Sequence, residues 1–165
     1  MKIIGVDPGS AITGYAVIKR ESAKDHKFKA LDFGCIVTDQ YLPAGERLKK
    51  IHKDLGKIIE KHKPDIISVE SLYFFKNLKT VMPVSQARGV ILLTAAEKRV
   101  PVIEFTPLQV KMAIVGYGRA EKKQIKEMMK YLIDIDGFDL KKNFRKKDDA
   151  IDAIGIAICA GLKSF

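Results

Sequence analysis

Four acidic residues have the chemistry and the placement of a metal-ion site. Asp7 and Glu70 each end a short apolar run, and Asp149 and Asp152 lie three residues apart farther along the chain. Carboxylate oxygens without His or Cys partners suit Mg²⁺, for which Mn²⁺ can substitute. Two such ions, about 3.5 to 4 Å apart, orient an attacking water and stabilise the leaving oxygen in phosphodiester hydrolysis. The acids therefore predict a two-ion magnesium site with hydrolytic activity.

Each acid also has an ordinary structural interpretation. Asp7 precedes a proline and a glycine, and Asp is common at the start of such a turn. Glu70 can be a solvated strand end. Asp148, Asp149 and Asp152 can be N-cap and first-turn acids of a helix, where they interact favourably with the helix dipole. The coincidence of all these placements in one chain is what favours the metal site.

The charge of the whole chain indicates the kind of partner. Thirty Lys and Arg against twenty Asp and Glu give a net charge of +10. A basic protein gains affinity for nucleic acid because neutralising phosphates releases counterions. Carboxylates gathered in such a chain suggest a cation site that accepts a polyanion. Hydrophobic residues make up 47% of the 165 residues, which predicts one core and a single domain over residues 1–165.

Two further features concern the environment of the protein. Cys35 and Cys159 lie in apolar runs without a CxxC pattern, which predicts small core residues in a reducing compartment. No apolar stretch approaches the roughly 20 residues of a membrane span, and the first apolar run is too short for a signal peptide. We therefore expect a soluble, cytoplasmic protein without membrane contact.

The elements that must position the acids alternate along the chain. Short apolar or β-branched runs predict five strands, at residues 2–6, 14–18, 28–37, 65–70 and 101–105. Apolar residues at helical spacing predict helices, at residues 45–63, 84–98, 107–115, 119–132 and 149–162. Residues 134–147 are polar and predict a loop. This order predicts an α/β fold, with a mixed five-stranded sheet flanked by helices.

The predicted elements bring the acids together. A strand that ends in a carboxylate places it at the rim of the sheet, where open α/β sheets bind their ligands. If the strands of Asp7 and Glu70 are parallel neighbours, both acids reach the same edge. Asp149 and Asp152 share one face of the last helix because they are three residues apart. A helix lying across the sheet then turns both toward the other two.

Several segments, in this order, resemble the RuvC family of Holliday-junction resolvases. They are VDPGS with TGYAVI, VESLYFFKN, SQARGV, QVKMAIVGYGRAEKKQ at residues 109–124, and DDAIDAIGIAI. The two-glycine segment ending in Ala-Glu-Lys and the Asp-x-x-Asp-Ala pattern are the specific ones. The resemblance implies a ribonuclease H-like fold, a homodimer, and paired symmetric nicks in four-way junction DNA during recombination and repair. It also implies partnership with a branch-migration complex of the RuvA and RuvB type.

The resemblance also implies roles for individual residues. Asp7, Glu70, Asp149 and Asp152 match the family's catalytic, metal-holding acids, and the pattern fits Asp149 better than its neighbour Asp148. Lys111 and Lys122 match lysines that approach the scissile backbone. Tyr73 matches a wedge aromatic, and Phe74 beside it can stack on unpaired bases. Arg88 fits either a dimer interface or DNA.

Three alternative functions remain open at this level. A ribonuclease H-like module can bind DNA without catalysis and merely retain the acids. A related nuclease of RNA processing shares the same chemistry. The turn after Asp7, with Gly9 and then Thr13-Gly14, resembles the first phosphate loop of actin-like ATPases and sugar kinases. Those enzymes need a second such domain, which 165 residues do not supply.

Overall fold

A computed structural model describes residues 1–20, 27–71, 78–134 and 148–163, with residues 78–80 described as backbone only. The strands are β1 (Lys2–Asp7), β2 (Ile12–Lys19), β3 (Phe28–Val37), β4 (Ile66–Glu70), β5 (Val102–Phe105) and β6 (Ile133–Asp134). The helices are α1 (Ala44–His62), α2 (Leu78–Glu97), α3 (Pro107–Val115), α4 (Lys122–Leu132) and α6 (Asp148–Lys163). Within the described ranges, no helix is long and apolar enough to cross a membrane.

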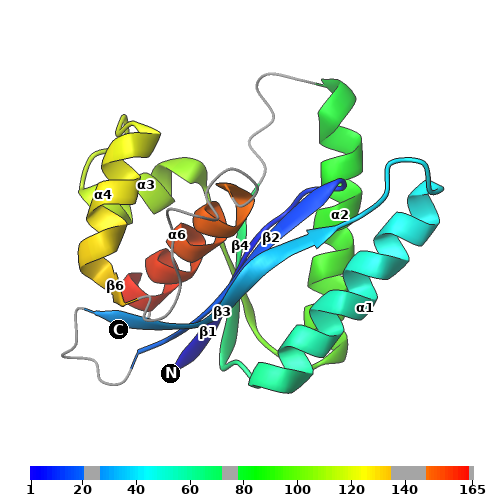
Figure 1. The fold of residues 1–165 in the computed structure, drawn as a ribbon, viewed down its shortest axis with the longest axis horizontal. Coiled ribbons are helices and arrows are strands. Elements are labelled where there is room, and N and C mark those ends of the chain that lie inside the picture. Colours follow the sequence, from blue (N-terminus) through cyan, green and yellow to red (C-terminus); the bar gives the residue numbers. More distant parts are fainter. Residues whose placement is uncertain (21–26, 72–77, 135–147, 164–165) are drawn as a thin grey trace.

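The strands form one sheet in the order β5-β4-β1-β2-β3-β6 (Figure 1). β1, β2 and β3 are joined as an antiparallel meander, whereas β4 pairs in parallel with both β1 and β5. The predicted mixed sheet flanked by helices is therefore confirmed. A parallel strand needs a crossover connection, and the α1 and α2 helices supply those that lead to β4 and β5.

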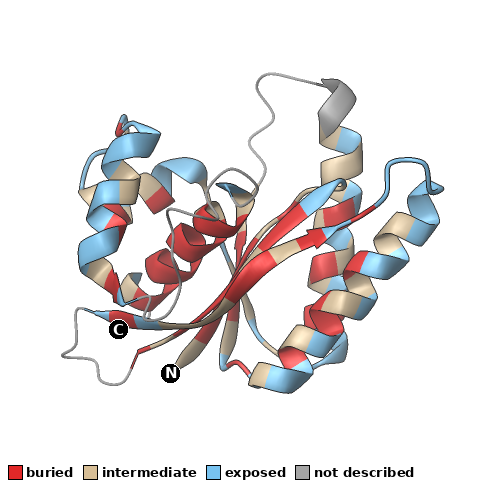
Figure 2. Ribbon diagram, viewed as in Figure 1, coloured by how far each residue is buried: buried red, intermediate tan, exposed pale blue. Residues whose placement is uncertain are grey.

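Helices cover both faces of the sheet. α1 and α2 lie on one side, and α3, α4 and α6 lie on the other. Figure 2 shows buried residues along the sheet and on the inner sides of the helices. Adjacent residues of β1 face opposite cores: Ile3 packs with α6, and Ile4 packs with the core under α1 and α2. A strand buried on both faces explains why its sequence is a continuous apolar run.

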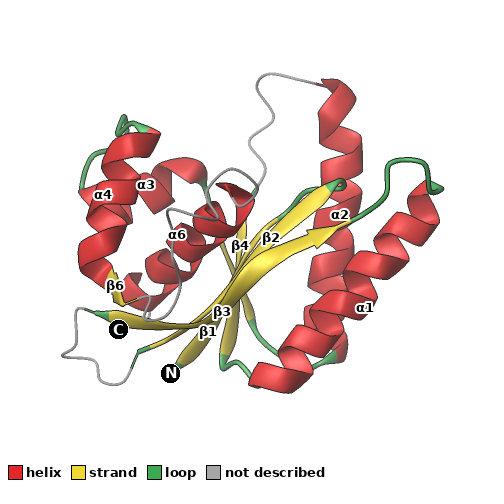
Figure 3. Cartoon of the chain, in the orientation of Figure 1, coloured by secondary structure: helices red, strands yellow, loops and turns green. Residues whose placement is uncertain are grey.

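The prediction of five strands is wrong by one. β6 has two residues, and it pairs in parallel with the start of β3 through Phe28 with Ile133 and Lys29 with Asp134 (Figure 3). A two-residue strand carries no period that a sequence pattern can reveal. Ile133 directly follows the helix predicted at residues 119–132, and Asp134 begins the loop predicted at residues 134–147.

Helix ends also differ from their predicted positions. α2 begins at Leu78, six residues before the predicted start at residue 84. It contains Pro83, although a proline inside a helix removes a backbone hydrogen bond. α4 begins at Lys122 rather than Arg119, because Glu121 is its N-cap and forms a capping box with Gln124. Gly116 follows α3 with φ of 75°, a left-handed conformation that favours glycine.

α6 crosses the sheet at unusually short range. A β-carbon on Gly5 of β1 would overlap the carbonyl oxygen of Ala153, and one on Gly14 of β2 would overlap the carbonyl of Asp149. The Ser68 hydroxyl of β4 also donates to the Ile156 carbonyl at 2.9 Å. The glycines let the backbone of α6 rest on the sheet. Residues 150–161 of α6 are buried except for the half-buried Asp152.

A polar cluster around Asp32 links α1 to the sheet. Lys61 donates to Asp32 Oδ2 at 2.8 Å, and His62 Nε2 lies 2.9 Å from the same oxygen. The Tyr15 hydroxyl donates to Asp32 Oδ1 at 3.4 Å. Burial opposes ionisation, but the hydrogen bonds from Lys61 and His62 outweigh it and lower the pKa of Asp32. The cluster holds the end of α1 against β2 and β3.

Candidate active site

Asp7 and Glu70 lie side by side at one edge of the sheet. β1 and β4 are parallel, with Val6 opposite Val69, and the next residue of each strand is the acid. Both strands end there, so both side chains leave the sheet at the same edge. The predicted meeting of these two acids is confirmed.

The first turn of α6 reaches the same edge. In the antiparallel pairing of β1 with β2, Asp7 is opposite Gly14, and the Asp149 carbonyl packs directly against that glycine. One turn farther along α6, the Asp152 Oδ2 atom accepts a hydrogen bond from Lys122 Nζ at 3.1 Å. Strand pairing and the close approach of α6 thus bring the four predicted acids into one region.

The electrostatics of Asp7 reflect this crowding. Burial, followed by the charges of Glu70, Asp152 and Asp149, raises the pKa of Asp7 from 3.8 to about 8, and Lys122 opposes the rise. Burial and the charge of Asp152 also raise the pKa of Glu70. Carboxylates that are held close together destabilise one another's charge.

Asp148 and Asp149 point to different surroundings. The Asp148 carboxylate accepts a hydrogen bond from Lys126 at 2.9 Å and lies 3.6 Å from Lys122, both on α4. The hydrogen bond from Lys126 is the main cause of its lowered pKa. Asp149, in contrast, is one of the charges that raise the pKa of Asp7. Asp149 therefore belongs to the acid cluster, and Asp148 ties α6 to α4.

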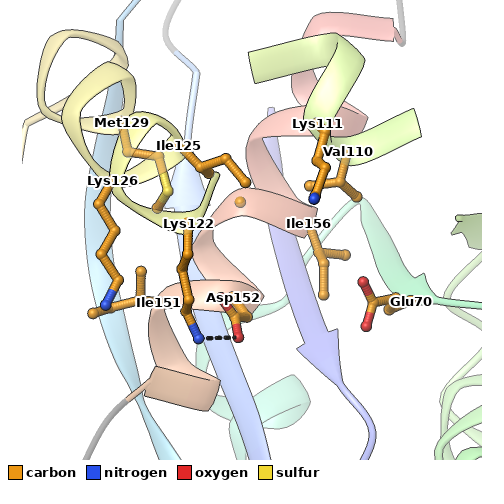
Figure 4. A pocket seen from close by; sticks show the side chains of 11 residues that line it. Glu70, Val110, Lys111, Lys122, Ile125, Lys126, Met129, Ile151, Asp152 and Ile156 are labelled. Carbon is orange, nitrogen blue, oxygen red and sulfur yellow. Dashed lines mark hydrogen bonds and ion pairs between the residues drawn. The ribbon is translucent and has the colours of Figure 1, made fainter. Parts of the chain in front are cut away.

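Lys111 and Lys122 both border a pocket beside the acids. The pocket holds about 250 Å³ and lies between α3, α4 and α6, with Glu70 and Asp152 at its margin (Figure 4). Its lining residues are Glu70, Val110, Lys111, Lys122, Ile125, Lys126, Met129, Ile151, Asp152, Gly155 and Ile156. The apolar members gave no functional signal in the sequence, because their spacing is that of ordinary core residues.

Three sequence predictions concern residues that belong neither to the four acids nor to the pocket. Tyr73 and Phe74 lie outside the described residues, as does most of the predicted loop, at residues 135–147. Arg88 is described: its Nε donates to Glu104 Oε1 at 2.8 Å and links α2 to β5. This ion pair gives Arg88 a structural contact within the chain.

The residues of the acid cluster fit divalent cations by their chemistry. Asp7, Glu70, Asp149 and Asp152 offer only hard oxygen atoms, and cations would relieve the repulsion that raises the pKa of Asp7. Among the described residues, no group of three or more Asp, Glu, His or Cys side chains is already drawn together as a set of metal ligands. Binding of ions would therefore require the side chains to adjust.

The mixed sheet, the helices on its two faces and the acids at its edge define a nuclease of the ribonuclease H-like class. Residues 3–160 match the family model described as crossover junction endodeoxyribonuclease RuvC. The chain belongs to the RuvC family. Nucleases of this family are metal-dependent in general. The match removes the ATPase and RNA-processing alternatives.

Individual relatives agree with this assignment. The crossover junction endodeoxyribonuclease RuvC of Halothermothrix orenii is 47% identical over 161 residues, which are 98% of this chain and 92% of that protein. The protein of the same name from Syntrophomonas wolfei is 44% identical over 96% of this chain and 87% of its own length. The structure of Thermus thermophilus RuvC in complex with Holliday junction substrate has a TM-score of 0.88 and 28% identity, covering 99% of this chain and 94% of that one.

Proposed function

We propose that this protein resolves Holliday junctions by hydrolysing one phosphodiester bond in each of two strands. The relatives named above are crossover junction endodeoxyribonucleases, and one similar structure contains a Holliday junction. The observation that carries the proposal is the gathering of acids around Asp7, which raises its pKa to about 8. A site that destabilises its own negative charge is suited to cations and to reacting groups that bring compensating charge.

Asp7, Glu70, Asp149 and Asp152 are the proposed ligands of two Mg²⁺ ions, for which Mn²⁺ can substitute. When bound, the ions supply an activated water and stabilise the leaving oxygen. The separate contacts of Asp148 with Lys122 and Lys126 support Asp149 rather than Asp148 as a ligand. The negative charge of Asp148 is already balanced by two lysines of α4.

The lysines have a different task in the proposal. Lys122 donates to Asp152 at 3.1 Å, and cations bound to that acid would release its ammonium group toward a phosphate. Lys111 forms no hydrogen bond or ion pair with another described residue, and its Nζ faces the pocket in Figure 4. Two ammonium groups at this margin can bind the DNA backbone and balance the charge that develops in the transition state. Tyr73 and Phe74 are proposed to stack on bases at the branch point.

Two symmetric nicks need two active sites, so the proposal includes a homodimer. It also includes a cytoplasmic location and cooperation with a branch-migration complex of the RuvA and RuvB type. Sedimentation of the free protein and of its complex with a four-way junction tests the dimer directly. A monomer in both samples would contradict this part.

The experiment that tests the function uses labelled DNA. The protein is incubated with a four-way junction or a linear duplex of the same sequence, in Mg²⁺, Mn²⁺ or chelator, and with ATP in a parallel sample. We expect paired nicks at symmetric positions in the junction alone, only with divalent cation, and no ATP hydrolysis.

Two variants sharpen this experiment. Asp7→Asn removes one proposed ligand without changing the size of the side chain, and it should abolish nicking while junction binding persists. The control is Asp54→Asn on α1, where Asp54 pairs with Lys50 and Lys57 away from the acids. It should cleave as the unmodified protein does. Junction binding without cleavage in either cation would support the non-catalytic alternative instead.

A further inference from the structure

Ser68 is a buried polar residue in the middle of an apolar strand. It lies in β4 and is fully buried, and its neighbours Ile67 and Val69 are apolar core residues. A buried hydroxyl is more informative than a buried apolar side chain, because it adds little hydrophobic stabilisation and must find a hydrogen-bond partner. The Ser68 hydroxyl donates to the Ile156 carbonyl of α6 at 2.9 Å.

This hydrogen bond lies in the row of the sheet that supports α6. Gly5 of β1 is paired with Ser68 of β4, and a β-carbon on Gly5 would overlap the Ala153 carbonyl of the same helix. A steric contact of this kind sets only how closely α6 can approach the sheet. A hydrogen bond also resists withdrawal and sliding, because its strength depends on both distance and direction. Ser68 therefore fixes the position of α6 along β4.

Two of the proposed ligands lie at similar distances from this hydrogen bond. Glu70 is two residues beyond Ser68 on the same face of β4, which is about 6–7 Å along a strand. Asp152 is one turn before Ile156, which is about 6 Å along a helix. Glu70, Asp152 and Ile156 all border the pocket in Figure 4, so this turn of α6 faces the end of β4. The hydrogen bond therefore determines how far the two carboxylates lie from each other.

We propose that Ser68 is a positioning residue for the cation site. Its hydroxyl holds α6 at the position along β4 at which Glu70 and Asp152 reach one bound cation together. The inference rests on the proposed function and adds to it the contact that sets the spacing of two ligands. Mg²⁺ accepts little deviation from octahedral geometry at about 2.0–2.1 Å, whereas Ca²⁺ tolerates irregular shells at about 2.3–2.6 Å. A small shift of α6 should therefore weaken binding of Mg²⁺ more than binding of Ca²⁺.

A purely structural role of the hydroxyl would have other consequences. Its loss would then lower the stability of the protein without changing the preference among cations. Thr94 offers the comparison, because it is also fully buried and its hydroxyl donates to the Val90 carbonyl at 2.7 Å. It lies on α2, on the other face of the sheet. Thr94→Val removes this hydroxyl at nearly constant volume, which makes it the matched control.

The first test measures cation binding without DNA. Mn²⁺ bound to the free protein is followed by electron paramagnetic resonance and displaced with Mg²⁺ or with Ca²⁺. In Ser68→Ala, we expect the affinity for Mg²⁺ to fall on the order of fivefold, the factor that corresponds to one lost hydrogen bond. The affinity for Ca²⁺ should fall by less than about twofold. Thr94→Val should bind both cations as the unmodified protein does, even where its melting temperature is as low as that of Ser68→Ala.

Equal losses of Mg²⁺ and Ca²⁺ affinity in Ser68→Ala would overturn the proposal, because they would indicate a general weakening of the site. So would unchanged affinities, or a shift of the same size in Thr94→Val. Ser68→Cys tests the hydroxyl itself, since a thiol is a weaker donor. Its Mg²⁺ affinity should lie between those of the unmodified protein and Ser68→Ala. A lower affinity than that of Ser68→Ala would mean that the size of the side chain matters rather than the hydrogen bond.

The second test follows single-turnover cleavage of a four-way junction over a series of Mg²⁺ concentrations, with junction binding in chelator as the reference. Ser68→Ala should need on the order of fivefold more Mg²⁺ for its half-maximal rate, and saturating Mg²⁺ should restore the rate to within about twofold. A reduced rate at saturating Mg²⁺ with an unchanged half-maximal concentration would contradict the positioning role. Absence of cleavage by the unmodified protein would contradict the proposed function separately, because the first test contains no DNA.

Discussion

The carbonyl oxygen of Asp149 packs against the α-carbon of Gly14, so closely that a β-carbon on residue 14 would overlap it. Because Gly14 is opposite Asp7 in the sheet, this contact fixes how far the first turn of α6 lies from the end of β1. A glycine in the middle of a strand therefore determines the spacing of two acids that are far apart in the sequence.

Gly14→Ala should damage both stability and cleavage. The added methyl group forces α6 away from β2, and overpacking of this kind costs about 2 kcal/mol of unfolding free energy. The shift also separates Asp149 from Asp7. Urea unfolding and junction cleavage measure the two effects. Gly56→Ala on α1 is the control, since its β-carbon would meet Lys98 Cε at an ordinary 3.8 Å and should leave cleavage unchanged. Normal cleavage by Gly14→Ala would disprove this role.

Asp7→Asn should stabilise the cation-free protein at alkaline pH. The pKa of Asp7 is raised from 3.8 to about 8, so folding favours its protonated form, and this contribution to stability is lost as pH rises from about 4 to 8. The amide carries no charge and escapes the loss. We expect a gain on the order of 5 kcal/mol at pH 8 and little difference at pH 4.

Thermal unfolding in chelator measures this difference. Added Mg²⁺ or Mn²⁺ should raise the melting temperature of the unmodified protein more than that of Asp7→Asn, because bound cations remove the repulsion. Identical melting curves for the two proteins at pH 8 would contradict the crowding of acids at this site.

Asp148 and Asp149 should respond differently to the same substitution. Asp149→Asn removes a proposed ligand and should reduce single-turnover cleavage by at least about a hundredfold, the size of a lost transition-state interaction. Asp148→Asn weakens the contacts with Lys126 and Lys122 and should reduce single-turnover cleavage by about tenfold or less. Titration with Mn²⁺ separates the causes, since only Asp149→Asn should weaken cation binding. The reverse order would assign the ligand to Asp148.

Lys111→Gln should change the salt dependence of junction binding. Each ammonium group that neutralises a phosphate releases counterions, so its loss lowers the slope of log affinity against log salt by about 1. Binding is measured in chelator over a series of salt concentrations. Lys57→Gln is the matched control, because Lys57 pairs with Asp54 on α1. Equal slopes for the two variants would show that Lys111 does not contact the backbone.

Asp32→Asn should weaken the attachment of α1 to the sheet above acidic pH. The pKa of Asp32 is lowered, so its contribution to stability is present above 3.8 and is lost as pH falls through the lowered value. We expect a loss of about 1–2 kcal/mol at pH 7, which vanishes in acid. Unfolding by urea at several pH values provides the measurement. Glu127→Gln breaks the pair with Lys130, which also lowers the pKa of Glu127, but solvent screens this exposed pair, so the dependence should be much weaker.

The sequence was sufficient for features that depend on local pattern. An apolar run ended by a carboxylate predicted where Asp7 and Glu70 leave the sheet, and the spacing of Asp149 and Asp152 predicted a shared helix face. Both follow from the periods of strands and helices. The parallel pairing that unites the first two acids was an inference from fold class, and the structure confirms it.

Features that depend on contacts between distant segments were not predictable. The two-residue β6 has no period of its own, and the pocket joins residues of three helices that look like separate core positions. The sequence placed Gly14 in a strand and in a possible phosphate loop, and only the approach of α6 shows why a side chain is excluded there. The pairing of Asp148 with α4, which separates it from Asp149, likewise required the arrangement in space.

The burial of α6 also bears on protein synthesis. This helix supplies one side of a core and two of the four proposed ligands, yet it follows every other described element in the chain. A nascent polypeptide whose residues 148–163 are still inside the ribosome lacks both. Folding of this core and the proposed cleavage of DNA therefore depend on the same segment, residues 148–163.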